Sequence, residues 1–255
     1  MSLYPMAATL IIQLYNCLMA MGLKREPKFI FFDMGEVLIR RNEPIHFSIL
    51  KELGIKSDDY EKTFLEFLSN RPKRLNEEFK RIRDVQDQIA FFNDSNRAMC
   101  EYFGVEPDEK LIERMTHHSI KGSFFFLENV IMTLDELEKN YGLGIITNAL
   151  PSRRENEIKD LGLERYFRVI IISKEKGFDK PDGRIYKLAA EEAGVSASDI
   201  LFVDDIEKNL DGAVAAGIDN VVLVGEPSDS DKYPTIRNVS ELVQLLKTSK
   251  RKYIG

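Results

Sequence analysis

Four groups of polar side chains stand in this sequence where they could carry out phosphoryl-transfer chemistry together. Three of the groups end a short apolar run, and the fourth lies in the loop after another such run. In chain order they are Asp33, Thr147 with Asn148, Lys180, and Asp204 with Asp205. Carboxylates that are crowded together need a cation, and an all-oxygen set of ligands suits Mg²⁺. The sequence therefore predicts a magnesium site where these groups converge.

The order of the groups, rather than any one of them, indicates the chemistry. A single aspartate after a strand is more often a capping or turn residue, and an Asp-Lys-Pro tripeptide usually begins a helix. Together, Mg²⁺ and Lys180 would neutralise a phosphoryl group enough for the anionic Asp33 to attack it. We therefore expect a covalent aspartyl phosphate on Asp33, which water then hydrolyses.

The elements that must position these groups alternate between helix and strand after Glu128. Continuous apolar runs predict strands at residues 142–147, 168–173, 199–205 and 219–224. Residues 154–163 and 181–194 are predicted to be helical, with Pro181 at the start of the second helix. The alternation predicts an α/β fold, a Rossmann-like doubly wound parallel sheet covered on both faces. Ligands of such sheets bind beyond the carboxyl ends of the strands, where the four groups would meet.

A long helical region separates Asp33 from the rest of the predicted sheet. Residues 43–124 carry apolar side chains at three- and four-residue steps and few strand signals. Such a block cannot lie within the layers of the sheet without breaking them. We therefore predict a small all-helical cap at residues 43–124, inserted into a core of residues 25–42 and 125–255.

The order and wording of these segments resemble the haloacid dehalogenase superfamily, most of whose members are phosphatases. FFDMGEVL is similar to its first motif, LGIITN to the second, and GFDKPDGRIY to the third, which contains Lys-Pro. ILFVDDIEKNLDGAVAAG is similar to the fourth, an acidic pair followed by Asn and a Gly-Ala helix. The resemblance covers residues 28–224. It implies a Rossmann-like core with a helical cap between the first two motifs.

The resemblance also implies a role for each residue of the four groups. Asp33 would be the nucleophile and a metal ligand. The other metal ligands would be Asp204, Asp205 directly or through its water, and the main-chain carbonyl of Gly35. The phosphate would be held by Thr147, Asn148 and Lys180, the last of which would also balance charge. Asn209 is a secondary candidate in the fourth motif.

Gly35 departs from the family's usual pattern, because most of its phosphatases have a second aspartate two residues after the nucleophile. That aspartate protonates the leaving oxygen, and positioned proton transfer contributes roughly 10²–10⁴-fold in rate. Its loss should slow hydrolysis of ordinary alkyl phosphates and matter less for better leaving groups, such as those of anomeric sugar phosphates. Some sugar-1-phosphate phosphatases of the family look similar, with glycine here. Glu36 is a candidate for the missing acid, against the alternative of a solvated turn residue.

The composition limits the partners. The 255-residue chain has a formal net charge of −6, which provides no general field to attract nucleic acid. Two cysteines are too few for a disulfide framework and indicate a reducing, cytoplasmic compartment. Residues 1–24 form an apolar extension, for which we favour a helix that packs on the domain or a partner over a membrane or targeting segment. These features of the sequence do not predict an oligomeric state.

These features favour a Mg²⁺-dependent phosphatase that acts on a small phosphorylated metabolite through Asp33. The alternative is a phospho-ligand-binding regulatory protein that has lost turnover, and a halide-releasing hydrolase is a third candidate. Arg153 and Arg154, just beyond Asn148, are candidate contacts to phosphate or substrate. Basic residues of the cap could reach a second anionic group of the substrate, although we favour a solvated helix face for them; they are Arg71, Lys73, Arg74, Arg81 and Arg83.

Overall fold

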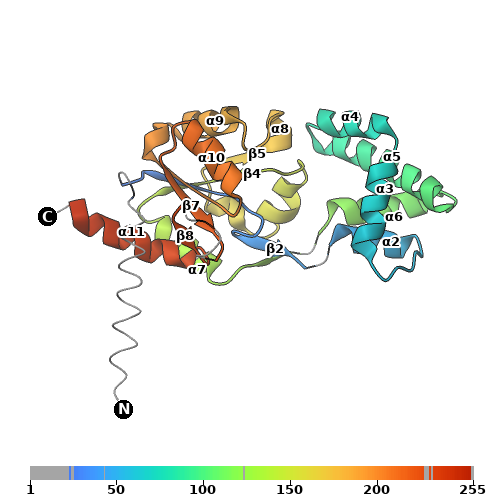
Figure 1. Ribbon diagram of the computed structural model, residues 1–255, viewed down its shortest axis with the longest axis horizontal. Coiled ribbons are helices and arrows are strands. Elements are labelled where there is room, and N and C mark those ends of the chain that lie inside the picture. Colours follow the sequence, from blue (N-terminus) through green and yellow to red (C-terminus); the bar gives the residue numbers. More distant parts are fainter. Residues whose placement is uncertain are drawn as a thin grey trace, which may run out of the picture.

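The chain forms two lobes, an α/β core and an all-helical cap, which lie side by side in Figure 1. This computed structural model describes residues 23, 26–42, 44–122, 124–226, 230 and 232–253. The predicted apolar extension, residues 1–24, lies outside the described residues except for Leu23, which is packed in the core. Among the described residues, no helix has both the length and the apolar character needed to cross a membrane.

The core is built on a six-stranded parallel sheet with the order β5-β4-β1-β6-β7-β8. Its strands are β1 (Phe29–Phe32), β4 (Gly142–Thr147), β5 (Val169–Ile172), β6 (Ile200–Asp204), β7 (Asn220–Val224) and β8 (Thr235–Ile236). The chain builds outward from β1 to β5 on one side and then returns to build β6 to β8 on the other. The predicted doubly wound α/β fold is confirmed, and its switch point lies at β1.

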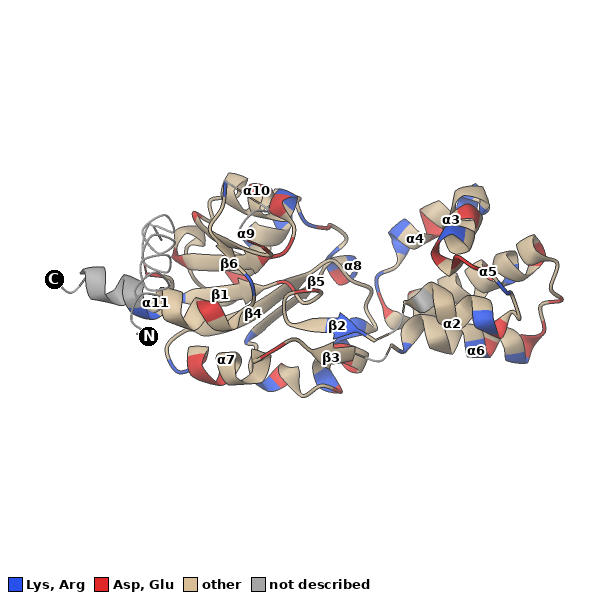
Figure 2. Cartoon of the chain, turned by 60° about the horizontal axis from the view of Figure 1, so that its bottom comes forward, with Lys and Arg blue, Asp and Glu red and all other residues tan. Residues whose placement is uncertain are grey.

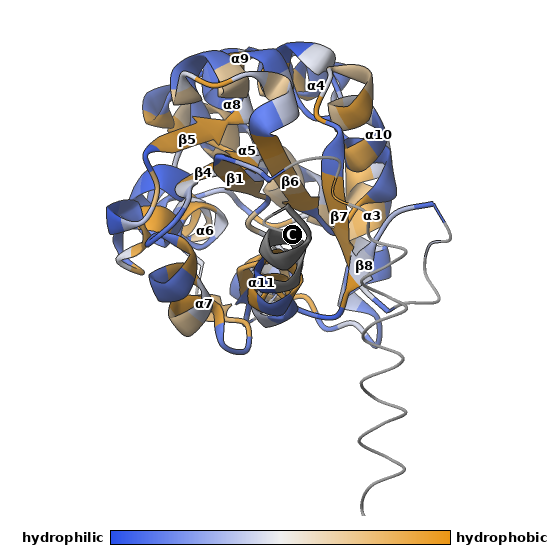
Figure 3. Cartoon of the chain, turned by 90° about the vertical axis from the view of Figure 1, so that its left-hand side faces the viewer, coloured by the Kyte–Doolittle hydropathy of each residue, from blue (hydrophilic) through white to orange (hydrophobic). Residues whose placement is uncertain are grey.

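Alternate residues of β1 face opposite layers of the core, as the pleat of a strand requires. Phe29 and Phe31 belong to the cluster that includes residues of α9 (Gly183–Ala193) and α10 (Glu207–Ala215). Ile30 and Phe32 belong to the cluster on the other face, with α7 (Val130–Leu137) and α11 (Ser240–Tyr253). Figure 3 shows the hydrophobic strands between these two layers of helices. Burial on both faces explains why the strands are apolar without alternation.

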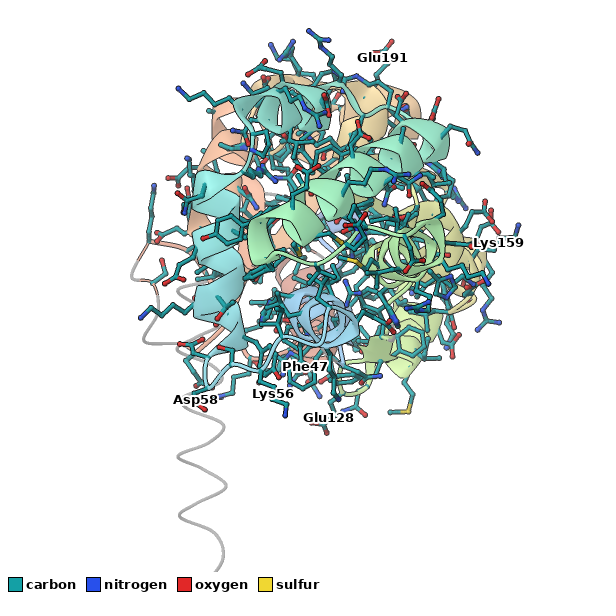
Figure 4. All side chains as sticks on the ribbon, turned by 90° about the vertical axis from the view of Figure 1, so that its right-hand side faces the viewer. Phe47, Lys56, Asp58, Glu128, Lys159 and Glu191 are labelled. Atoms are coloured by element: carbon teal, nitrogen blue, oxygen red, sulfur yellow. The ribbon has the colours of Figure 1, made fainter. Side chains whose placement is uncertain are left out.

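The cap consists of α2 (Ile45–Glu52), α3 (Tyr60–Asn70), α4 (Lys73–Arg81), α5 (Val85–Phe103) and α6 (Glu109–Ile120). The side chains of Asp59, Asp84 and Asp108 accept hydrogen bonds from backbone N–H groups in the first turns of α3, α5 and α6. Acidic and basic residues alternate over its surface (Figure 2), and Lys56 and Asp58 point outward (Figure 4). Because the cap helices run from Ile45 to Ile120, we keep residues 43–124 as its proposed extent.

Two short strands connect the lobes. β2 (Ile39–Arg41) leads into the cap and β3 (Phe124–Phe126) leads out of it, and the two pair as an antiparallel ribbon. Arg41 and Phe124 are partners in this register. Both chain crossings between the lobes therefore lie next to each other.

Two predicted helices differ from the structure in their type or bounds. Residues 154–163 were expected to be one helix, but Arg154–Lys159 is a π-helix and a turn follows it. The helix expected to begin at Pro181 begins at Gly183, where the Asp182 side chain accepts a hydrogen bond from the backbone N–H of Arg184. Pro181 instead follows a cis peptide bond from Lys180. The loop after β5 thus keeps Lys180 outside the helix.

Candidate active site

Asp33 lies directly beyond β1, at the carboxyl edge of the sheet. Its backbone N–H donates to the carbonyl of Val203 at 2.8 Å, which continues the pairing of β1 with β6 by one residue. The side chain of Asp33 remains 14% exposed. The sheet therefore fixes the backbone of Asp33 beside the end of β6 and leaves its carboxylate accessible.

Lys180 joins two of the predicted carboxylates. Its Nζ donates to Asp33 Oδ1 at 2.7 Å and to Asp204 Oδ2 at 2.6 Å, although these residues are far apart in the sequence. Lys180 is 4% exposed. Burial alone would lower the pKa of its ammonium group, but the charges of Asp33 and Asp204 outweigh that effect, and the pKa is raised. Lys180 therefore stays charged over the physiological pH range.

Asn148 holds the backbone of Lys180 through two hydrogen bonds. Its Nδ2 donates to the Lys180 carbonyl at 2.9 Å, and its Oδ1 accepts from the Lys180 N–H at 2.7 Å. Thr147, the last residue of β4, is buried next to it. The loop after β5 is thereby fastened to the end of β4. Asn148 positions Lys180, in addition to its predicted proximity to the phosphate.

Asp204 and Asp205 end β6 in different environments. Asp204 Oδ1 accepts hydrogen bonds from the Ile206 N–H at 2.8 Å and from Asn209 Nδ2 at 3.0 Å, so Asn209 orients this carboxylate. Burial, together with the charge of Asp33, raises the pKa of Asp204 despite the neighbouring Lys180. Burial and the charges of Asp33 and Asp204 raise the pKa of Asp205 to about 6. The site carries more negative charge than its one lysine neutralises.

This excess of negative charge bears on the predicted magnesium site. Within the described part of the chain, no three acidic, histidine or cysteine side chains surround one point closely enough to hold an ion. Lys180 itself lies between Asp33 and Asp204. The donor chemistry nevertheless fits Mg²⁺, because the available groups are oxygens. Burial is the main cause of the raised pKa values of Asp204 and Asp205, and the charge of Asp33 adds to it; a divalent cation would offset that repulsion.

Gly35 and Glu36 lie in the turn after Asp33 and have different surroundings. A side chain at Gly35 would meet no other atom within 4 Å of its first carbon. Glu36 adopts a left-handed backbone conformation with a φ of 56°, and its side chain is 50% exposed. Its Oε2 lies 2.6 Å from Nη2 of Arg40. This ion pair at the surface supports the reading of Glu36 as a solvated turn residue.

A cavity of about 360 Å³ begins at Gly35 and Asn148 and extends between the core and the cap. Of the two arginines considered after β4, Arg153 lines this cavity, whereas Arg154 forms an ion pair with Glu175 at 2.8 Å. The cap residues Arg71 and Arg74 are engaged within the cap, by Asn76 and by Glu78. The ion pair of Glu36 with Arg40 also lines the cavity, and beyond this pair two further charged residues line it that the sequence did not single out, Arg41 and Glu157.

The sequence offered one weak signal for each of these residues. Arg41 is the second residue of an arginine pair eight residues beyond Asp33, and Glu157 stands four residues after Arg153. Neither spacing indicates a cavity by itself. Both become visible only when the connecting ribbon and the π-helix are placed.

Comparison with known proteins identifies the family. The pattern of haloacid dehalogenase-like hydrolases matches residues 30–223. A glyceraldehyde 3-phosphate phosphatase of Methanopyrus kandleri is 32% identical over 147 residues, which are 53% of this chain and 62% of that protein. The pyrimidine 5'-nucleotidase YjjG of Escherichia coli is 28% identical over 233 residues, 86% of this chain and 97% of that protein.

Solved structures share the fold. A 2-haloacid dehalogenase of Pseudomonas syringae superposes with a TM-score of 0.64 at 24% identity, over 87% of this chain and 99% of that one. The putative hydrolase YfnB of Bacillus subtilis, bound to magnesium, gives a TM-score of 0.60 at 20% identity over 87% and 99%. The family resemblance seen in the four motifs is confirmed, and the chain belongs to the haloacid dehalogenase-like hydrolases.

Proposed function

We propose that this protein is a Mg²⁺-dependent phosphatase that hydrolyses a small phosphomonoester through an aspartyl phosphate on Asp33. The observation that carries the proposal is the position of Lys180 Nζ, within 2.7 Å of Asp33 Oδ1 and 2.6 Å of Asp204 Oδ2. This arrangement holds a partly exposed carboxylate beside a buried cation, which is what an acidic nucleophile needs to approach an anionic phosphoryl group.

In the first step, an oxygen of Asp33 attacks phosphorus while the bond from phosphorus to the ester oxygen breaks. Because Lys180 donates to Oδ1, we assign the attack to Oδ2. The leaving ester oxygen takes its proton from solvent. In the second step, water attacks the same phosphorus and gives up a proton to solvent, the bond from phosphorus to Asp33 breaks, and inorganic phosphate leaves. Lys180 keeps Asp33 oriented and offsets its charge throughout, while Asn148 keeps Lys180 in place.

Asp33, Asp204, Asp205 and the carbonyl of Gly35 would hold the magnesium ion. When bound, the ion would neutralise phosphoryl oxygens and the surplus charge of the carboxylates. The pairing of Asp204 with Asn209 and with the N–H of Ile206 fixes one of these ligands in advance. Preorganised ligands of this kind reduce the rearrangement that metal binding requires.

The relatives support a phosphate ester as the substrate. The two relatives compared above are named for glyceraldehyde 3-phosphate and for pyrimidine nucleotides, both of them phosphate monoesters. Gly35 supplies no acid for the leaving group. We therefore expect the preferred ester to have a leaving group that departs without full protonation, such as the anomeric oxygen of a sugar phosphate.

The test is a phosphate-release screen over small phosphomonoesters, including anomeric sugar phosphates, with and without Mg²⁺. Turnover should require Mg²⁺ and fall to background in Asp33→Asn. Asp135→Asn is the matched control, because Asp135 is an exposed carboxylate of α7 paired with Arg165. Turnover that persists in Asp33→Asn would refute the proposed nucleophile.

Gly35 also favours one alternative, a regulatory protein that binds a phosphorylated ligand without turning it over. Calorimetry with inorganic phosphate and Mg²⁺ separates the two functions. Binding with no turnover across the screen would favour the regulatory protein. A parallel assay for halide release from 2-haloacids should give no signal, since the surplus of carboxylates around Lys180 has no use in that reaction.

A further inference from the structure

Two arginines meet at one wall of the cavity that leads away from Asp33. Arg41 ends β2 of the connecting ribbon, and Arg153 follows β4 in the core, so two separate segments of the chain supply them. Their guanidinium carbons lie 5.5 Å and 6.0 Å from the centre of the same ring, that of Phe124. Both arginines line the cavity together with Gly35 and Asn148 of the catalytic site.

The charge of these arginines is only partly balanced. Glu157 is 6% exposed and lines the same cavity. Its Oε2 lies 2.7 Å from Arg153 Nε, but outside hydrogen-bonding geometry, so that neither buried atom has a hydrogen-bond partner. Arg41 donates a long hydrogen bond of 3.4 Å to the carbonyl of His118. Two guanidinium groups therefore share one carboxylate, and their hydrogen-bonding capacity is incompletely used.

The protonation behaviour of the cluster agrees with this imbalance. Burial lowers the pKa of Arg41, and Arg153 lowers it further, although Glu157 opposes both effects. Burial also raises the pKa of Glu157 despite its two arginine neighbours. Neither charge is fully compensated inside the cluster. An additional anion would stabilise the charged form of Arg41 and would compete with Glu157 for Arg153.

We propose that Arg41 and Arg153 form an arginine subsite that binds a second anionic group of the substrate, a carboxylate or a second phosphate. The inference rests on the proposed phosphatase function and narrows its substrate to a phosphomonoester with a further negative charge. Guanidinium groups bind such planar or tetrahedral anions through paired N–H donors. Glu157 holds Arg153 beside the cavity and gives way to the incoming anion.

Matched substrate pairs test this subsite. In the first pair, 3-phosphoglycerate and glycerol 3-phosphate differ by a carboxylate, and in the second, 1,3-propanediol bisphosphate and its monophosphate differ by a phosphate. We expect kcat/KM to be about tenfold or more higher for the member that carries the second anionic group, in at least one pair, as a charge-assisted hydrogen bond provides. Below, this member is called the anionic substrate. The pair that shows the preference identifies the anion.

Variants assign the preference to the subsite. Arg41→Gln and Arg153→Gln should raise KM for the anionic substrate about tenfold and leave the values for its matched partner nearly unchanged. Arg41→Lys should restore part of the preference, and Glu157→Gln should lower KM for the anionic substrate by removing the competing carboxylate. Arg154→Gln is the control, because it removes the same charge from the neighbouring residue, which pairs with Glu175 instead.

The outcomes separate this inference from the proposed function. Equal kcat/KM within both pairs, or arginine variants that weaken both members equally, would overturn the subsite while leaving the phosphatase intact. If no ester is hydrolysed, the phosphatase proposal fails, and calorimetric binding of the same pairs to Asp33→Asn decides the subsite. A binding preference for the anionic member that Arg41→Gln abolishes would support it, and equal binding of both members would refute it.

Discussion

At the scale of single residues, Gly35 lacks the acid that most phosphatases of the family have at this position, but it keeps the proposed metal ligand. That ligand is a main-chain carbonyl, which a residue with any side chain could supply. Because a side chain would meet no neighbour within 4 Å, the missing acid reflects the residue type and not a lack of room. The nearby Glu36, the other candidate acid, forms an ion pair with Arg40.

We predict that Gly35→Asp raises kcat for alkyl phosphates such as glycerol 3-phosphate. A carboxyl group at this position would donate a proton to the leaving oxygen, an effect of about 10²–10⁴-fold when well placed. Steady-state kinetics at pH 6–8 would measure it, with Gly35→Asn as the control for size and polarity. A gain shared equally by Gly35→Asn would contradict the role of the proton.

Asp205 should make the metal-free protein lose stability as the pH rises. Its pKa is about 6 in the folded chain against an ordinary value of 3.8, so the folded state holds the proton more tightly than the unfolded state. Stability from this group is therefore present below about pH 4 and lost by about pH 6. After allowance for solvent screening, the loss is about 1 kcal/mol.

Urea unfolding of EDTA-treated protein at pH 4.5 and pH 7 would show this loss. Asp205→Asn should remove it, so that the variant gains stability relative to the wild type at pH 7 but hardly at pH 4.5. Saturating Mg²⁺ should reduce the difference at pH 7, because binding to the folded state offsets the repulsion. A stability difference that is the same at both pH values would rule out Asp205 as its source.

At the scale of elements, α10 approaches the active-site loop closely at Gly212. A first side-chain carbon on Gly212 would lie 2.4 Å from the carbonyl oxygen of Pro181, the residue after Lys180. The helix and the loop can only pack this tightly with glycine at that position. The position of Lys180 thus depends on a helix that carries Asn209 as well.

We predict that Gly212→Ala lowers stability by about 1–3 kcal/mol, as overpacking commonly does. It should also lower kcat, because the displaced loop moves Lys180 away from Asp33. Thermal unfolding and phosphate release would measure the two effects. Gly183→Ala is the control, since the nearest neighbour of its added carbon would be Cβ of Ala216, at 3.9 Å. Unchanged kcat in Gly212→Ala would show that the loop tolerates the shift.

The sequence could predict these elements where the pattern is local. Apolar runs located the central strands, and the groups that follow them included Asp33, Lys180 and Asp204, which the structure brings into hydrogen-bonding contact. The type of helix at residues 154–159 was not predictable, because six residues are too few to distinguish the period of a π-helix from that of an α-helix. The facing of Arg153 and Glu157 into the cavity depends on that helix.

At the scale of the whole molecule, the cap is fastened to the core by a few specific contacts. Gln88 of α5 donates to Ser152 Oγ at 2.8 Å, and the Ser152 N–H donates back to Gln88 Oε1 at 3.0 Å. Leu150 of the core packs against the cap cluster around Phe91. Lys174 lies over the ring of Phe79 at 4.4 Å. All of these core residues follow β4 or β5 and so lie at the active-site edge of the sheet.

We predict that Gln88→Ala raises KM by up to about thirtyfold, because two hydrogen bonds worth about 1 kcal/mol each favour the closed arrangement that encloses the cavity. Steady-state kinetics would measure KM, and thermal unfolding would exclude a general loss of stability. Gln86→Ala is the control, since Gln86 is an exposed residue of the same helix. An equal rise of KM in both variants would contradict the role of this contact.

The paired connecting strands restrict how the cap can open. Because β2 and β3 hydrogen-bond to each other, neither connecting strand can extend without breaking these bonds. Rotation of the cap about the ribbon is the motion that keeps them. Arg41 lies on this ribbon, whereas Arg153 follows β4. A dianionic metabolite that bridges the two arginines would therefore act as a tie across the hinge. Binding of the correct metabolite would then also hold the cap closed and exclude bulk solvent from the cavity.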